Sequence, residues 1–170
     1  MNIVDALVSH HEQLRDLYRQ SENDTSIFEQ YIQHLVVHHT MEEKYFYDFL
    51  EKIGSARHDA LEAVNEHHII ELIIKDAQGF PRDHHNFPIK IEGLGEYTNH
   101  HLDEEESEIF PMAAALFAPA DLTTLGGLFE EAKARLLNIE LPDVPKQIDT
   151  SGAAANRNTA FGLGIGSLKT

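Results

Sequence analysis

Four histidines interrupt apolar helical stripes and lie at equal distances from the connections that separate them. In an antiparallel bundle, residues of successive helices are level when they are equally far along the chain from the connection between those helices. The midpoint between His11 and His38 falls in the polar stretch 22–25, that between His67 and His101 falls in the loop 79–88, and that between the pair formed by His38 and Glu42 and His67 falls at about residue 54, at Gly54-Ser55. A helical bundle would therefore bring all four to one level. They are His11, His38, His67 and His101.

Apolar residues recur in steps of three and four, which is the spacing of one helical face. The pattern predicts four long helices at about residues 2–21, 26–49, 56–78 and 88–116, and a shorter one at about residues 121–138. The expected fold class is all-α, an antiparallel up-down-up-down four-helix bundle with a short fifth helix and an irregular C-terminal tail. We assign residues 1–140 to the bundle with its accessory helix, and residues 141–170, which lack a hydrophobic period, to the tail.

The second and fourth helices each carry a histidine followed four residues later by a glutamate, and residues four apart share a helical face. The run His-x-x-x-Glu-Glu occurs at residues 38–43 and again at residues 101–106. Each half of the chain then offers a lone histidine on one helix and a His/Glu pair on the next. The pattern predicts a dinuclear metal site, because two glutamates can bridge two divalent ions. Its expected ligands are His11, His38, Glu42, His67, His101 and Glu105.

In the residues that follow the two His/Glu pairs, the spacing of three and four residues predicts which side chains face the core. In the second helix these are Tyr45 and Phe49, and in the fourth they are Ile109, Met112 and Leu116. We expect the tyrosine to pack against the core, which is the usual role of a buried tyrosine.

The composition excludes several classes of protein. The chain has 170 residues, no cysteine and a formal net charge of -16, which disfavours binding to nucleic acid or to an anionic membrane. No apolar run approaches the length of about 20 residues that spans a bilayer, and the first residues lack a basic region, so we expect a cytoplasmic protein. Without thiolates, imidazole and carboxylate are the ligands on offer. They suit iron first, with manganese or zinc as alternatives.

The sequence allows alternatives to some of the proposed metal ligands. Any one of the histidines can instead be a hydrogen-bonded core residue without a metal. His34 lies one turn before His38 and can reach the same ion. A register shifted by one residue would turn His39 inward in place of His38. We expect the neighbours of the proposed ligands to lie at the surface or behind the ligands; these are His10, His39, His68 and His100.

Four segments of the chain resemble the hemerythrin-like, HHE cation-binding family. They are Ser-His-His-Glu-Gln-Leu at residues 9–14, His-His-Thr-Met-Glu-Glu at 38–43, Glu-His-His-Ile-Ile at 66–70 and His-Leu-Asp-Glu-Glu-Glu-Ser-Glu-Ile-Phe-Pro at 101–111. The resemblance spans about residues 2–117. It implies a four-helix bundle around two non-haem iron ions with an oxo or hydroxo bridge, which binds or senses dioxygen or nitric oxide. It also leaves open a redox enzyme, or an iron-centre repair or iron-donating factor, that uses the same site.

The chain departs from the oxygen-carrying members of that family at one place. Those members have His-x-x-x-His on the third helix, whereas here the residue four before His67 is Ala63 and the residue four after it is Glu71. The set of four histidines and two glutamates resembles the pattern of the family's iron-centre repair proteins.

Overall fold

The structure, a computed structural model, describes residues 1–138 and is helical throughout, with no strand among those residues. In chain order the elements are α1 (Ile3–Asn23), η1 (Thr25–Ile27), α2 (Phe28–Glu42), η2 (Glu43–Tyr47), α3 (Asp48–Leu50), α4 (Arg57–Gly79), α5 (Phe87–Glu104), η3 (Glu105–Ile109), α6 (Phe110–Leu116) and α7 (Pro119–Leu136). The predicted all-α class is confirmed. The tail expected at residues 141–170 lies outside the described residues.

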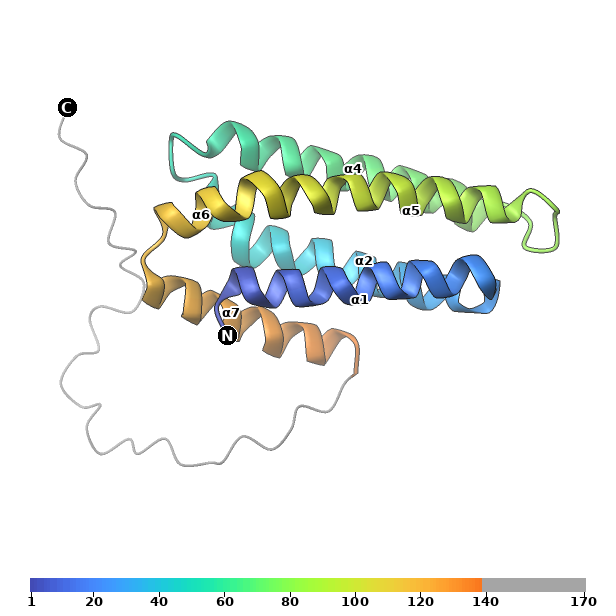
Figure 1. Cartoon of the computed structure of the whole chain (residues 1–170), viewed down its shortest axis with the longest axis horizontal. Coiled ribbons are helices and arrows are strands. Elements are labelled where there is room, and N and C mark those ends of the chain that lie inside the picture. The colour runs from blue at the N-terminus through green and yellow to red at the C-terminus, as the bar shows by residue number, and fades with distance from the viewer. Residues whose placement is uncertain (139–170) are drawn as a thin grey trace.

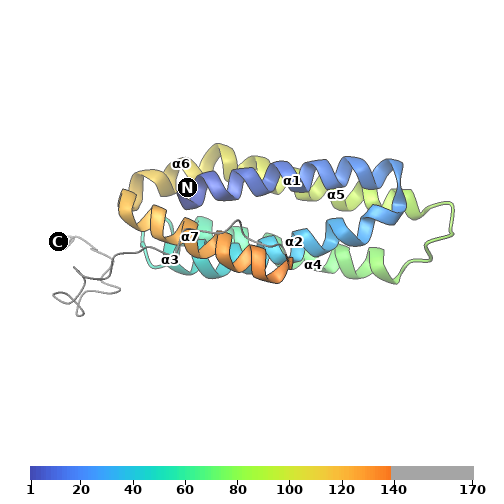
Figure 2. The same ribbon diagram turned by 90° about the horizontal axis from the view of Figure 1, so that it is seen from below.

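The long helices α1, α2, α4 and α5 lie lengthwise beside one another and are joined at alternate ends (Figure 1). Helix α1 contacts α2 and α5, and α4 contacts α5 and α2, so these helices surround a common interior. Helix α7 packs on the outside against α1 and α2, as Figure 2 shows from below. Within residues 1–138, no helix combines the length and the apolar character that crossing a bilayer requires.

Short local signals set the ends of these helices. The side chain of Asn2 accepts a hydrogen bond of 3.0 Å from the backbone N–H of Asp5 and so caps the start of α1. Proline stands in the first turn of both α5 and α7, where its missing N–H costs nothing. Helix α7 begins at Pro119, two residues before the predicted start, and ends two residues before the predicted end.

The apolar core consists of two clusters with a polar layer between them. Leu7 and Phe46 belong to one cluster, and Leu14 and Tyr31 belong to the other. Along α1, the two residues midway between Leu7 and Leu14 are His10 and His11, and both are fully buried. Buried polar side chains at this level come from every long helix; they are His10, His11, His38, His39, Glu42, His67, His101 and Glu105. The loops therefore set the level of the histidines as the midpoints predicted.

The segments η2 and η3 are single π-helical turns, and each adjoins a glutamate of the predicted site: Glu42 precedes η2 and Glu105 opens η3. A π-turn inserts one extra residue into a helix and is frequently found at functional sites. Two halves of the chain that share the His-x-x-x-Glu-Glu run therefore also share this departure from regular helix.

The extra residue advances the inward face of both helices by one position, so most of the residues predicted to point inward beyond the glutamates pack at the edge of the core and not within it. Tyr45 and Phe49 are half-buried, and Ile109 and Met112 are half-buried as well, while Leu116 is exposed. The residues that enter the core are each one place later; they are Phe46, Leu50, Phe110, Ala113 and Phe117.

Two glycines allow helices to approach closely. A Cβ atom on Gly95 would lie 2.0 Å from the ring of Tyr18, so the absence of a side chain lets α5 pack on α1. A Cβ atom on Gly126 would lie 2.5 Å from the carbonyl oxygen of Met1. Gly126 therefore lets α7 lie directly against the first residues of the chain and cover that side of the bundle.

Candidate metal centre

The structure brings all six predicted ligands together in the buried polar layer. They form two groups that share both glutamates, and within each group the ligand atoms lie within 4.8 Å of one another. The first group is His11, His38, Glu42 and Glu105, and the second is Glu42, His67, His101 and Glu105. Each of the two groups can hold a metal ion, since imidazole nitrogens and carboxylate oxygens are common ligands of first-row transition metals.

The carboxylate of Glu105 extends between the two groups. Its Oε2 atom is 3.3 Å from Nε2 of His11, and its Oε1 atom is 3.2 Å from Nε2 of His101. The hydroxyl of Tyr47 donates a hydrogen bond of 2.6 Å to the same Oε1 atom. Burial opposes ionisation here, but the imidazoles of His101 and His11 hold the pKa of Glu105 well below its usual range. Glu105 is thus a negative charge placed between imidazoles of both halves.

Glu42 occupies the equivalent place in the other half. Its Oε2 atom lies 3.4 Å from Nε2 of His38 and 3.5 Å from Nε2 of His67, and neither of its oxygens has a hydrogen-bond partner. Burial and the neighbouring Glu105 raise the pKa of Glu42. Two buried carboxylates this close repel one another when both are ionised, and a cation between them removes that cost.

Buried polar atoms without partners converge on this layer. An unpartnered buried donor or acceptor costs about 1–3 kcal/mol, so such atoms are rare in folded proteins and need an explanation. In this layer they are both oxygens of Glu42, Oε2 of Glu105, both ring nitrogens of His39 and the Nε2 atoms of His10, His67 and His101. Bound metal ions would satisfy the carboxylate oxygens, Nε2 of His67, Nε2 of His101 and one nitrogen of His39, and the residues present therefore fit a metal ion.

The outward ring nitrogens of the two lone histidines are held by carboxylates of the opposite half. Nδ1 of His11 is 2.8 Å from Glu106, which also accepts a 2.7 Å hydrogen bond from Arg15. Nδ1 of His67 is 3.0 Å from Glu43. Each of these glutamates directly follows a central glutamate in the His-x-x-x-Glu-Glu run. Carboxylates behind metal-bound histidines fix the tautomer and orientation of the ring, so this arrangement leaves Nε2 free to bind a metal ion.

The histidines of the two His/Glu pairs, His38 and His101, also have partners at their Nδ1 atoms. In each half of the chain, this partner is the residue just before the lone histidine. Nδ1 of His101 is 2.6 Å from Glu66, and Nδ1 of His38 is 3.2 Å from Nδ1 of His10. Burial opposes protonation of His101, but its neighbouring carboxylates raise its pKa to about 10. Burial and the nearby Lys133 lower the pKa of His10 to about 2, so this ring is neutral. The two halves thus match in position and differ in charge.

His39 is the residue that sequence reasoning missed. It was expected at the surface or behind the ligands, yet it is buried, and so is His38. The ring of His39 stacks on that of His67 with centroids 3.9 Å apart, and His39 forms a further group of possible ligands with His67 and His101. A signal was present in the sequence, since His39 lies close to an apolar line and its counterpart in the repeat is the apolar Leu102.

The other candidates lie farther from the centre. His34 is half-buried beside His10, with ring centroids 5.8 Å apart, and belongs to none of the groups found among residues 1–138. Tyr45 packs at the edge of one apolar cluster, and Tyr97, which stands at the place on α5 that corresponds to His34 in the repeat, packs at the edge of the other. The tyrosine at the centre is Tyr47, which the π-turn of η2 carries inward.

The model of the hemerythrin HHE cation binding domain matches residues 2–113 of the chain. That stretch contains α1, α2, α4 and α5 and every residue of the buried polar layer. Among curated proteins and among solved structures, no match was found. The match covers well over half of the chain, and the chain therefore belongs to the hemerythrin HHE cation-binding domain family.

Proposed function

We propose that the chain is a non-haem diiron protein whose up-down-up-down four-helix bundle binds or senses dioxygen or nitric oxide. The observation that carries the proposal is the position of Glu42 and Glu105, each of which faces ring nitrogens from both halves of the chain. Carboxylates placed in this way suit two cations that share them. Manganese and zinc accept the same ligands, and iron is the member of this set that also reacts with these diatomic molecules.

The two ions would have unequal ligand sets. His11 and His38 would hold the first ion and His67 and His101 the second, with both glutamates shared, and His39, which groups with His67 and His101, would add a third imidazole to the second ion. The first ion therefore has one imidazole fewer and keeps more positions open for a small molecule. The outer partners add to this inequality, because a carboxylate behind an imidazole makes it a more basic ligand than a neutral ring does.

Apolar residues shield this centre from water above, below and on the side of α7. Phe110 stacks on His11 with ring centroids 5.4 Å apart, and Phe129 of α7 lies edge-on to His38 at 6.3 Å. The two apolar clusters close the layer above and below. When bound, the iron ions supply open coordination positions and electrons, and the chain supplies a dry interior that small neutral molecules can enter.

An optical titration tests this function. We expect the reduced iron-loaded protein to develop a new, stable visible absorption band when dioxygen or nitric oxide is added. The band should disappear when the gas is removed, and the protein should not consume dioxygen continuously. Continuous consumption of dioxygen or peroxide with no lasting spectrum would contradict binding or sensing. That result would support a redox enzyme at the same site.

Replacing His39 by alanine tests the unequal ligand sets. We expect the variant to retain the ion near His11 with unchanged affinity and to bind the second ion about 10- to 100-fold more weakly than the unmodified protein does, because the second ion loses one of its three imidazoles. Elemental analysis of the purified protein measures the ratio of metal to chain. Full occupancy in the variant would show that His39 packs without binding a metal.

The matched control for that variant is His68→Ala. His68 adjoins His67 as His39 adjoins His38, but its side chain is exposed. The control is therefore expected to keep both ions, which separates loss of a ligand from loss of any histidine beside the centre.

A further inference from the structure

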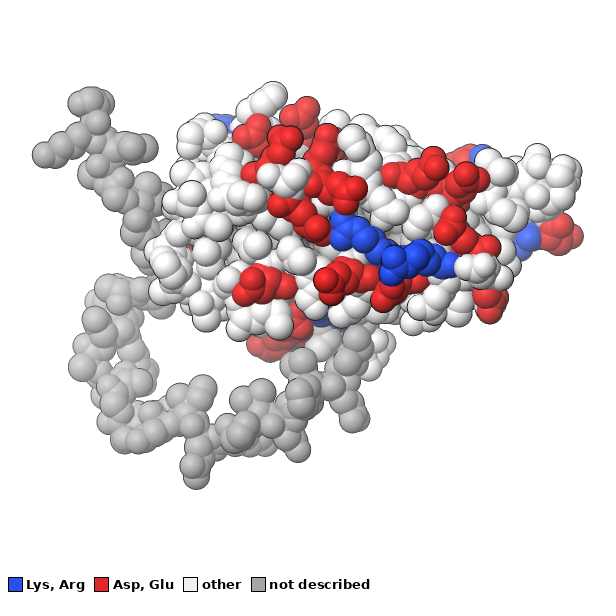
Figure 3. Space-filling model, viewed as in Figure 1, with Lys and Arg blue, Asp and Glu red and all other residues white. Residues whose placement is uncertain are grey.

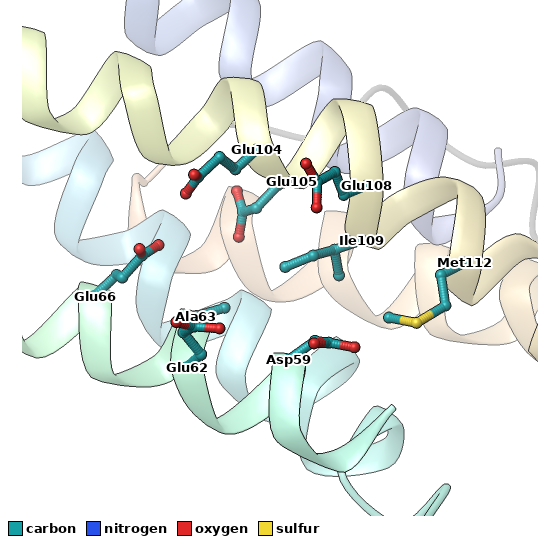
Figure 4. Close-up of a pocket in the computed structure, with 9 residues that line it drawn as sticks. All are labelled: Asp59, Glu62, Ala63, Glu66, Glu104, Glu105, Glu108, Ile109 and Met112. Carbon is teal, nitrogen blue, oxygen red and sulfur yellow. The ribbon is translucent and has the colours of Figure 1, made fainter. Parts of the chain in front are cut away.

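A cavity of about 330 Å³ opens between α4 and the segment formed by the end of α5, η3 and the start of α6. Two-thirds of its lining residues are acidic and none is basic. The acidic ones are Asp59, Glu62, Glu66, Glu104, Glu105 and Glu108. Figure 4 shows that they project from both sides of the opening, and Figure 3 shows further acidic side chains across the face that includes α5.

The floor of this cavity is a residue of the metal centre. Glu105 lines the cavity, yet its side chain is fully buried and its Oε2 atom has no hydrogen-bond partner. Figure 4 shows its carboxylate between those of Glu104 and Glu108 and the residues of α4. Glu66 also lines the cavity while holding Nδ1 of His101. The acidic residues at the mouth therefore lead to the central carboxylate.

The small side chain of Ala63 keeps this route open. Ala63 lies one helical turn before His67 and is itself a lining residue. A histidine or another large side chain at this place would project into the cavity above Glu105. The absence of a histidine at residue 63 thus leaves both a smaller inward ligand set on α4 and a passage to the surface.

We propose that this acidic cavity is the entrance through which divalent metal ions reach the centre, an inference that rests on the proposed metal site. Clustered carboxylates with low-dielectric walls concentrate cations and raise their association rates by about 10- to 1000-fold. Neutral dioxygen and nitric oxide gain nothing from this field. The carboxylates at the mouth hand the cation to Glu105, the buried ligand that lines the cavity.

The test uses the variant Glu62→Gln/Glu108→Gln, in which two exposed acids at the mouth lose their charge while the central ligands stay intact. The protein is stripped of metal and mixed with Co²⁺ in a stopped-flow spectrometer. We expect the uptake rate to fall by about tenfold at low ionic strength and the difference to shrink in high salt. The final amount of Co²⁺ bound should equal that of the unmodified protein.

The release rate gives a second reading. If the acidic residues at the mouth affect only the passage of the ion and not the bound state, the affinity for Co²⁺ is unchanged in the variant. Release of Co²⁺ into excess chelator should then slow by the same factor as uptake. The control Glu92→Gln/Glu96→Gln removes two exposed charges from α5 away from the cavity and is expected to keep the original rates. A further variant, Ala63→Leu, should slow uptake at every salt concentration by narrowing the passage.

Two results would overturn the proposal and are distinguishable. Equal uptake rates in the Glu62→Gln/Glu108→Gln variant and the unmodified protein would show that cations enter elsewhere, with the metal site itself intact. Failure of the unmodified protein to bind Co²⁺ at all would remove the metal site and the entrance together.

Discussion

Replacement of both Glu42 and Glu105 by glutamine is expected to abolish binding of both metal ions, with affinity reduced by about 100-fold or more at each. The two carboxylates belong to both groups of possible ligands, and together they supply the negative charge that offsets two divalent cations. Glutamine keeps the size of the side chain and removes its charge, so the effect reports electrostatics and ligation without a cavity. Elemental analysis and a Co²⁺ titration of the stripped protein measure the loss.

The control for this variant is Glu12→Gln/Glu71→Gln, which removes two exposed carboxylates from α1 and α4. It has the same change in net charge and is expected to bind both ions normally. Full metal content in the Glu42→Gln/Glu105→Gln variant would contradict the assignment of shared carboxylates.

Removal of the metal should strongly destabilise the bundle. A ligand that binds the folded state and is present at about 1000 times its dissociation constant adds about 4 kcal/mol to the free energy of unfolding. For a chain of this size, that corresponds to a change in Tm on the order of 10 °C. Loss of stability without metal is also expected because the buried atoms of Glu42, His39 and His67 that lack hydrogen-bond partners then stay without any partner.

Differential scanning calorimetry with and without a strong chelator measures this shift. The Glu42→Gln/Glu105→Gln variant serves as the reference, because chelation should leave its Tm unchanged. Identical Tm values for the loaded and the stripped unmodified protein would mean that the polar layer is stable by itself and that metal contributes nothing to the fold.

The level of the centre could be predicted from the sequence because it depends on distances along the chain. In a regular helix, the distance of a residue from the connection fixes its position along the bundle axis, and the glycine and polar stretches mark where the connections are. His11, His38, His67 and His101 therefore meet as expected, and the inward face of α4 is the predicted one, with Ala60, Ile70 and Ile74 buried as the spacing requires.

The details beyond the glutamates could not be predicted, because they depend on a local departure from regular helix. A π-turn has no clear signature in the spacing of apolar residues, so the stripe predicted through Tyr45 missed the burial of Phe46 and Tyr47. His39 was missed for a related reason. A spacing argument chooses one residue of the pair His38-His39 as the inward one, whereas the interior here is wide enough at this level to receive both side chains.

The most direct test of the central claim is the iron content of the folded chain. Protein produced in iron-rich medium and purified without chelator is expected to contain two iron ions per chain by elemental analysis, held by the buried histidines and the two shared glutamates. A content below one transition-metal ion per chain would contradict a dinuclear centre in this bundle.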